Sequence, residues 1–217
     1  GDEGVSKEIV LDALCKGKKV ITANKALVSK YWNEINKSCK KFNSSIFFEA
    51  AVAGGIPIIK IIKEFLLSNK ITKIYGILNG TSNFILTNMS LKNESFKHIL
   101  KQAQELGYAE ADPSFDIDGI DTAHKLSILS SIAFNLNCNL NKISTEGIRN
   151  IELVDLKYSE ELGYKIFIFK DTDVLKRKDT LDKEQCEDVL DEVESMLEGD
   201  LKSKIDFVLE AKGYDEE

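Results

Sequence analysis

Apolar residues recur along the chain at two spacings, one typical of helices and one of strands. A helical spacing over residues 5–15 returns over residues 26–42. The segment 18–25 lies between them as a short, mostly apolar run, which predicts a buried strand with polar residues at its end. Segments 45–52 and 71–78 are predicted to be further strands, and the second of them is rich in β-branched and aromatic residues.

The second half of the chain continues this alternation. A small-residue turn leads into Pro57, which suits the first turn of a helix because that position needs no N–H donor. Amphipathic helices are predicted over residues 94–106, with Gly107 as a left-handed terminator, and over residues 120–136. One more strand is predicted over residues 163–170. Strands that alternate with helices favour a mixed α/β core over an all-helical or all-β fold.

Composition narrows the class of protein. The 217 residues are 43% hydrophobic and carry a net charge of −7, which suits a globular core and disfavours nonspecific nucleic-acid binding. No run approaches the roughly 20 apolar residues that span a bilayer, and the acidic start lacks an apolar signal core. We therefore expect a cytoplasmic protein with no membrane partner. The four cysteines are far apart, as expected of free thiols in a reducing compartment.

A loop is predicted over residues 107–119, and an acidic segment begins in it and continues into the last predicted helix. Its carboxylates and the lysine that follows them are Glu110, Asp112, Asp116, Asp118, Asp121 and Lys125. One interpretation is structural: Asp118 caps the helix, and Asp121 and Lys125 form a solvated i,i+4 pair. A calcium-binding loop is excluded, because aligning Gly119 with the glycine of an EF-hand puts Lys125 where a bidentate glutamate is needed.

A polar-substrate site is the sharper interpretation of the same residues. Clustered carboxylates can bind an ammonium and a hydroxyl group, and a lysine among them can donate a proton to a developing alkoxide. A second lysine, Lys25, ends the first predicted strand, and open α/β sheets bind ligands at the carboxyl ends of their strands. By themselves, these residues leave both interpretations open.

Four motifs in a fixed order carry a resemblance to a known family. They are ITANK (21–25), EAAVAGGIPII (49–59), GILNGTSNFIL (76–86) and LGYAEADPSFDIDGIDTAHKL (106–126). From about residue 5 to about residue 170 the chain closely resembles homoserine dehydrogenases. The resemblance implies an enzyme of threonine and methionine biosynthesis that reversibly reduces L-aspartate 4-semialdehyde to L-homoserine with NAD(P)H.

The resemblance also implies roles for individual residues. Lys125 matches the proton donor, Asp121 is its neighbour in the substrate site, and Glu110 matches the residue that binds the amino end of the substrate. Lys25 matches a lysine that lies between substrate and cofactor. The remaining polar contacts match Thr81, Tyr108 and Asp116.

The segment EAAVAGGIP resembles the family's loop for a monovalent, sodium-like cation. The matching positions are Glu49, Val52, Gly54 and Ile56. Hard cations prefer oxygen ligands, and a glycine turn can aim carbonyl groups inward. A tight strand-to-helix turn is the alternative that the residues alone leave open. His124, beside the lysine, is expected to be a packed or surface residue rather than a catalytic one.

The resemblance predicts an α/β fold in three parts. Residues 1–45 would be a remnant of a Rossmann-type nucleotide-binding domain, and residues 46–170 an α+β substrate-binding and dimerisation domain with a mixed sheet covered by helices. Residues 171–217 are charge-rich and are expected to form an acidic helical tail. No G-x-G-x-x-G motif occurs, so we expect the isolated chain of this homodimeric family to be inactive. The alternatives are a truncated, non-catalytic paralogue that binds a ligand or dimerises, and a cation-binding structural domain.

Overall fold

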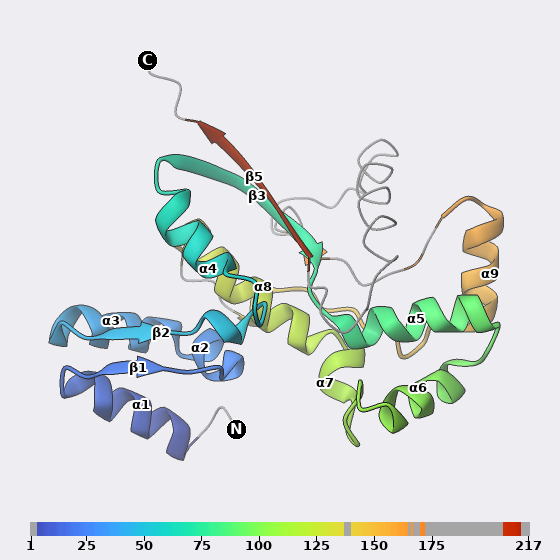
Figure 1. Cartoon of the computed structure of the whole chain (residues 1–217), viewed down its shortest axis with the longest axis horizontal. Helices are drawn as coiled ribbons and strands as arrows, with labels where there is room; N and C mark the ends of the chain where they lie inside the picture. The colour runs from blue at the N-terminus through green and yellow to red at the C-terminus, as the bar shows by residue number, and fades with distance from the viewer. Residues whose placement is uncertain (1–3, 137–139, 165, 167–169, 172–205, 214–217) are drawn as a thin grey trace. The chain divides into compact units, whose positions relative to one another are not determined.

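The fold is helix-rich with a small amount of sheet. A computed structural model describes residues 4–136, 140–164, 166, 170–171 and 206–213 (Figure 1). In chain order the elements are α1 (Val5–Cys15), β1 (Lys19–Ile21), α2 (Lys25–Lys30), α3 (Trp32–Phe42), β2 (Ser45–Phe47), the 3-10 turn η1 (Glu49–Ala51), α4 (Ile58–Lys60), the π-helical turn η2 (Ile61–Phe65), β3 (Asn69–Ile77), α5 (Gly80–Lys92), α6 (Phe96–Glu105), α7 (Ser114–Ile117), α8 (Ile120–Ala133), the 3-10 turn η3 (Leu140–Lys142), α9 (Leu153–Glu161), β4 (Lys170–Asp171) and β5 (Asp206–Gly213).

The described residues form two compact units. Unit 1 contains residues 4–75, 122–136, 140–144 and 208–213. Unit 2 contains residues 76–121, 145–164, 166, 170–171 and 206–207. Strand β3 is the middle strand of a three-stranded sheet with the order β4-β3-β5. None of the helices in the described ranges is long and apolar enough to cross a membrane.

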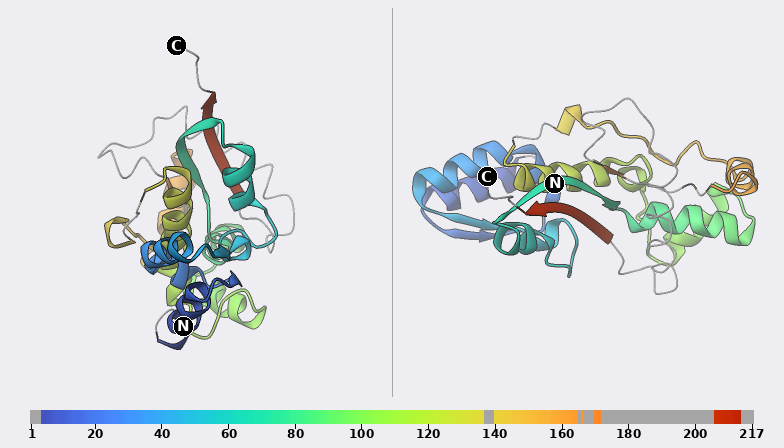
Figure 2. Two further views of the ribbon diagram at one scale, coloured as in Figure 1. Left: turned by 90° about the vertical axis from the view of Figure 1, so that its left-hand side faces the viewer. Right: turned by 90° about the horizontal axis from the view of Figure 1, so that it is seen from above.

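Unit 1 begins with a parallel pair of strands. β1 and β2 pair in register from Lys19 with Ser45 to Ile21 with Phe47. Helices α1 and α3 pack on each other and on one side of this pair (Figure 2, right). Ile21 and Phe47, the last pair of residues in this register, are exposed to solvent: Ile21 is 86% exposed and Phe47 is 52% exposed. The prediction of a buried strand over residues 18–25 is therefore wrong: the strand is three residues long, and helices cover only one face.

The core of unit 1 lies where α2 and α3 meet the segment after β2. Leu27, Val28 and Ile35 are fully buried, and the ring of Trp32 meets that of Phe48 edge-on, with 5.7 Å between centroids. The carboxyl-terminal half of the strand predicted over residues 45–52 is instead the turn η1.

Unit 2 is organised around α5. This helix packs against α6, α7 and α9 (Figure 1). The apolar cluster among them contains Phe84, Ile85, Leu86, Met89, Ile99, Ala103, Ala109, Ile117, Ile148 and Leu156. The predicted helix over residues 94–106 is confirmed as α6, and Gly107 follows it in the left-handed region with φ of 75°.

Three sequence expectations need correction. The segment 107–119, expected to be a loop, contains the short helix α7. Asp118 is the C-cap of α7 and does not cap the next helix, which begins at Ile120. Residues 206–213 form the strand β5 where a helical tail was expected. The rest of that tail, and most of the strand predicted over residues 163–170, lie outside the described residues.

Candidate active site

Asn79 marks the start of α5 and organises the polar groups of unit 2. Its side-chain Oδ1 accepts a hydrogen bond from the backbone N–H of Ser82, at 2.8 Å, which caps the helix. Because that N–H can only donate, the carbonyl end of the amide must face it, and the NH₂ end must face the other way. Asn79 is 2% exposed, so its orientation is held by the surrounding protein.

The NH₂ group of Asn79 bridges two carboxylates of the acidic segment. It donates to Asp116 Oδ1 at 2.7 Å and to Asp121 Oδ2 at 3.0 Å. Asp121 is 1% exposed, and Asp116 is half-buried. The side-chain amide of Asn79 therefore brings together two carboxylates, one from α7 and one from α8. Two carboxylates gathered in this way favour a cationic group beside them.

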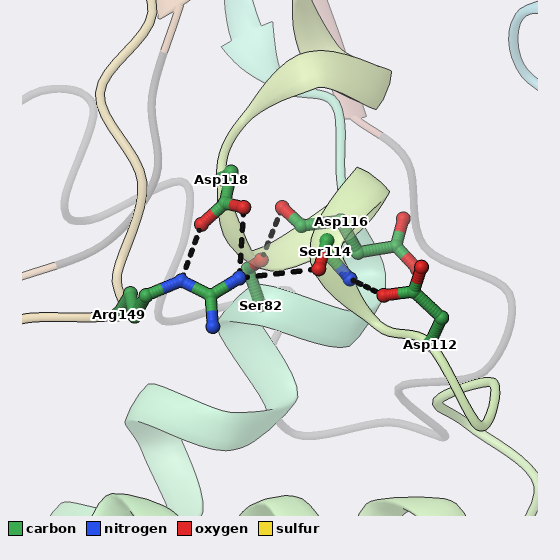
Figure 3. Close-up of polar contacts among 6 residues, drawn as sticks. All are labelled: Ser82, Asp112, Ser114, Asp116, Asp118 and Arg149. Carbon is green, nitrogen blue, oxygen red and sulfur yellow. Dashed lines mark hydrogen bonds and ion pairs between the residues drawn. The ribbon is translucent and has the colours of Figure 1, made fainter.

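A second contact between α5 and the acidic segment involves Thr81. Its hydroxyl donates to the carbonyl oxygen of Tyr108 at 2.9 Å. The ring of Tyr108 packs on Phe84, with 4.5 Å between the ring centroids. In the same turn, the Ser82 hydroxyl donates to the Asp116 carbonyl oxygen at 3.0 Å (Figure 3). The first turn of α5 thus fixes both ends of the segment that carries the acids.

Helix α8 carries Asp121 at its start and Lys125 one turn later. Lys125 is only 7% exposed. The interpretation of these two residues as a solvated surface pair is therefore wrong. A buried ammonium retains its charge only among polar or acidic groups, so the burial itself indicates a specific environment.

His124 ties α8 to α2 within unit 1. The Ser29 hydroxyl donates to the Ala26 carbonyl oxygen at 3.2 Å and also contacts Nδ1 of His124. His124 is buried, which confirms the expectation of a packed residue. Lys25 is half-buried at the start of the same α2, directly after the N-cap Asn24, whose Oδ1 accepts from Leu27 N–H at 3.0 Å.

Glu49 lies in unit 1 and bonds to the start of the helical segment after Pro57. Its Oε1 accepts from Ile59 N–H at 2.7 Å, and its Oε2 accepts from Lys60 N–H at 3.1 Å. Burial lowers the pKa of Lys63, and the attraction of Glu49 partly offsets this shift. Within the described ranges, no three His, Cys, Asp or Glu residues gather as a metal cluster.

Arg149 holds the outward-facing side of the acidic segment (Figure 3). Its Nε donates to Asp118 Oδ1 at 2.9 Å, and its Nη2 donates to Asp118 Oδ2 at 2.8 Å. This hydrogen bonding holds the pKa of the Asp118 carboxyl below its ordinary value. The carboxyl of Asp112 also has a lowered pKa, and the cause is hydrogen bonding to Ser114. Both the side chain and the backbone N–H of Ser114 contribute, and that nitrogen lies 3.1 Å from Asp112 Oδ1.

Comparison with known proteins gives these residues a context. A family model described as homoserine dehydrogenase matches residues 57–193. The homoserine dehydrogenase of Neisseria gonorrhoeae is 52% identical over 166 residues, which are 76% of this chain and 38% of that protein. The chain belongs to the homoserine dehydrogenase family. The enzyme of Bacillus subtilis is 45% identical over 159 residues, which are 73% of this chain and 37% of that protein. The chain thus spans well under half the length of these relatives.

Solved structures of homoserine dehydrogenases share the fold. The crystal structure from Thiobacillus denitrificans superimposes with a TM-score of 0.76 at 52% identity, covering 79% of this chain and 39% of that one. A putative homoserine dehydrogenase from Archaeoglobus fulgidus matches 94% of this chain and 55% of its own, with a TM-score of 0.72 and 30% identity. A hyperthermophilic archaeal homoserine dehydrogenase in complex with NADPH matches 70% of this chain and 46% of its own, at 35% identity and a TM-score of 0.63.

The structure distributes the predicted homoserine dehydrogenase site residues over both units. In unit 2, contacts join Thr81 to Tyr108, and Asn79 joins Asp116 to Asp121. Glu110 is exposed in the same unit, and its carbonyl oxygen accepts from the side chain of Gln104 at 3.0 Å. The residues of unit 1 are Lys25, Glu49, Val52, Gly54, Ile56 and Lys125.

Sequence reasoning missed two residues, Asn79 and Arg149. A signal for Asn79 was present, since an asparagine directly before a predicted helix start is a common N-cap. No comparable signal marks Arg149, which is 31 residues from Asp118 in the sequence. Only the folded chain brings that pair together.

Proposed function

We propose that the chain is the substrate-binding and catalytic part of a homoserine dehydrogenase. The reaction interconverts L-homoserine and NAD(P)⁺ with L-aspartate 4-semialdehyde, NAD(P)H and a proton. Membership of the family supports this proposal. The observation that carries it is the pair of half-buried Asp116 and buried Asp121 on one amide of Asn79, with buried Lys125 one turn after Asp121 on α8.

Substrate binding follows from charge. Homoserine and its aldehyde carry an ammonium and a carboxylate, so their site must offer groups of both signs. Glu110 and Asp116 would bind the ammonium, because hydrogen bonds between charged groups are the strong ones. The first turn of α5, with Thr81 and Tyr108, would provide further donors and acceptors. The bridge through Asn79 would hold Asp116 in place before the substrate arrives.

Proton transfer falls to Lys125. In the reducing direction its ammonium would donate a proton to the carbonyl oxygen of the aldehyde, and in the oxidising direction its amine would remove the proton from the hydroxyl of homoserine. Asp121, one turn earlier, would favour the protonated lysine and orient the reacting oxygen.

Lys25 would contact the nicotinamide cofactor. It follows the carboxyl end of β1, where open α/β sheets bind their ligands, and it begins α2. A nicotinamide cofactor, when bound, would supply or accept the hydride. The archaeal relative solved in complex with NADPH supports NADP(H) as the cofactor class to test first.

A monovalent cation and a second copy of the chain complete the proposal. Oε1 of Glu49 accepts from the backbone N–H groups of Ile59 and Lys60, and Oε2 accepts from that of Lys60. A carboxylate has further acceptor sites for a sodium-like ion. The carbonyl groups of Val52, Gly54 and Ile56 would complete the site, and the positive φ of Gly54, 58°, supports a turn that can aim them. A melting temperature that rises with sodium chloride but not with choline chloride would support this site.

Light scattering during gel filtration would test for the expected homodimer.

The decisive experiment is a titration of L-homoserine into the chain, followed by calorimetry. Glu110→Gln is expected to weaken binding roughly 10- to 100-fold, because it removes a charged partner of the ammonium. Lys125→Met, which keeps the length of the side chain, is expected to alter binding much less, because the lysine acts on the reacting oxygen. Asp112→Asn is the matched control, since it removes an exposed carboxylate two residues from Glu110.

Circular dichroism of each variant separates loss of binding from loss of folding. No binding of homoserine by the folded wild-type chain at millimolar concentration would contradict the proposal. Equal weakening by Glu110→Gln and Asp112→Asn would indicate a general charge effect and would contradict the assigned role of Glu110.

A further inference from the structure

Two backbone segments of unit 2 approach each other unusually closely. The Ile148 N–H donates to the Ile117 carbonyl oxygen at 2.8 Å. A Cβ atom placed on Gly147 would lie 2.2 Å from that same oxygen and 2.5 Å from Asp118 Cα. On the other side, a Cβ on Gly119 would lie 2.8 Å from the Glu146 carbonyl oxygen. The glycines therefore allow the end of α7 to lie directly against residues 146–148.

Arg149 fastens this contact from the side (Figure 3). Its guanidinium forms the two parallel hydrogen bonds to Asp118, and Nη2 also donates to the Ser114 hydroxyl at 3.2 Å. Ser114 begins α7, and Asp118 is its C-cap. One planar side chain thus holds both ends of the helix, an arrangement that the point charge of a lysine cannot reproduce.

The helix held in this way carries a predicted substrate residue. α7 has four residues, far too few to be stable by itself, so external contacts must fix its orientation. On its inner side the Asp116 carboxylate accepts from Asn79, and the Asp116 carbonyl oxygen accepts from Ser82. On its outer side Arg149 holds Ser114 and Asp118 (Figure 3). Asp116 lies between the two sets of contacts.

We propose that Arg149 is a positioning residue: by clamping α7 at Ser114 and Asp118, it holds the Asp116 carboxylate in the orientation that binds the ammonium of the substrate. The proposal rests on the proposed function for the identity of the ligand and for the role of Asp116 in binding it. The clamp itself follows from contacts within unit 2.

Arg149 and Asp118 are partly exposed, so a positioning role can be distinguished from a contribution to stability. The side chain of Arg149 is 52% exposed and that of Asp118 is 36% exposed. Exposed ion pairs of this kind contribute little to the free energy of unfolding. The buried Ile117 keeps α7 attached to the core, so loss of the clamp should loosen the ends of α7 without unfolding the unit. The affinity for substrate should therefore change more than the stability does.

The test uses Arg149→Met, Arg149→Lys and the charge swap that combines Arg149→Asp with Asp118→Arg. Lys101→Met is the matched control, because it breaks an exposed ion pair of the same unit, Lys101 with Glu105, at 3.7 Å. We expect Arg149→Met to raise the dissociation constant for homoserine roughly five- to thirtyfold. Arg149→Lys should fall between the wild type and Arg149→Met, and the charge swap should recover part of the affinity. The control should bind as the wild type does.

Amide hydrogen exchange reports on the clamp without any ligand. In Arg149→Met the amides of Asp118, Gly119 and Ile148 should exchange faster, since their hydrogen bonds to Ser114, Asp116 and Ile117 define the clamped geometry. Unchanged exchange of these amides would refute the clamp. If the wild type binds homoserine and Arg149→Met binds it equally well, the positioning role is refuted. If the wild type binds no homoserine, the proposed function fails, while the exchange data still decide whether the clamp exists.

Discussion

Two pairs of carboxylates in the acidic segment differ sharply in their surroundings. Asp116 and Asp121 face inward and share the amide of Asn79. Asp112 and Asp118 face outward, where Ser114 and Arg149 hold them and lower their pKa values. The sequence presents all four as one acidic run. In the structure one pair shares the amide of Asn79, and Asp116 of that pair is proposed to bind substrate, whereas Ser114 and Arg149 hold the other pair.

This comparison shows that charge density alone does not identify a binding site. The inward pair accepts hydrogen bonds from the neutral side-chain amide of Asn79. The charge of Asp118 is already matched by a guanidinium, and the backbone N–H of Ser114 satisfies Asp112. Mutations at the two pairs should therefore act in different ways, and the following predictions test this from the largest expected effect to the smallest.

Gly147→Ala should have the largest effect, and it acts on the outward pair. The new methyl group would overlap the Ile117 carbonyl oxygen and Asp118 Cα, so the backbone must move. We expect the free energy of unfolding to fall by about 3 kcal/mol or more, measured by urea denaturation. Gly55→Ala is the control, because a Cβ there meets no atom within 4 Å. Similar stability of the two variants would show that the close approach is not required.

Asn79→Ala should rank second, and it acts on the inward pair. It removes the helix cap and leaves two carboxylates without their shared donor, for a loss of about 2 kcal/mol of stability. Homoserine binding should also be lost. The control is Asn88→Ala, because Asn88 belongs to the same helix and its side chain donates to the Phe84 carbonyl oxygen, at 2.9 Å, rather than to a carboxylate. Retention of homoserine binding by folded Asn79→Ala would contradict the role of the bridge.

Acid should produce the smallest effect, which follows from the lowered pKa of Asp118. Because the pKa of Asp118 is lower in the folded state, its ion pair stabilises the protein above the unfolded-state pKa. That contribution is lost as the pH falls through the lowered folded-state pKa. At neutral pH, Asp118→Asn should melt about 2 °C or less below the wild type, because the pair is exposed. The difference should vanish in strong acid, and a difference that persists there would contradict an electrostatic origin.

The sequence predicted secondary structure best for elements whose formation depends on their own residues. The helix at residues 94–106 and the strand at residues 71–78 were confirmed within a few residues, because spacing and propensity are local properties. The buried strand at residues 18–25 was wrong, because the burial of a strand depends on what covers it. Asp118 was taken for a helix cap, because its real partner, Arg149, is distant in the sequence.

The candidate site shows the same division. The motifs of the chain were enough to indicate its family, and the comparisons confirmed it, because the order of chemically specialised residues is written in the sequence itself. The bridging role of Asn79, the burial of Lys125 and the grip of Arg149 on Asp118 were decided by the tertiary structure. Residues that are tens of positions apart in the sequence form a hydrogen bond only if the fold brings them close in space. The pattern of residues along the chain does not give that spatial distance.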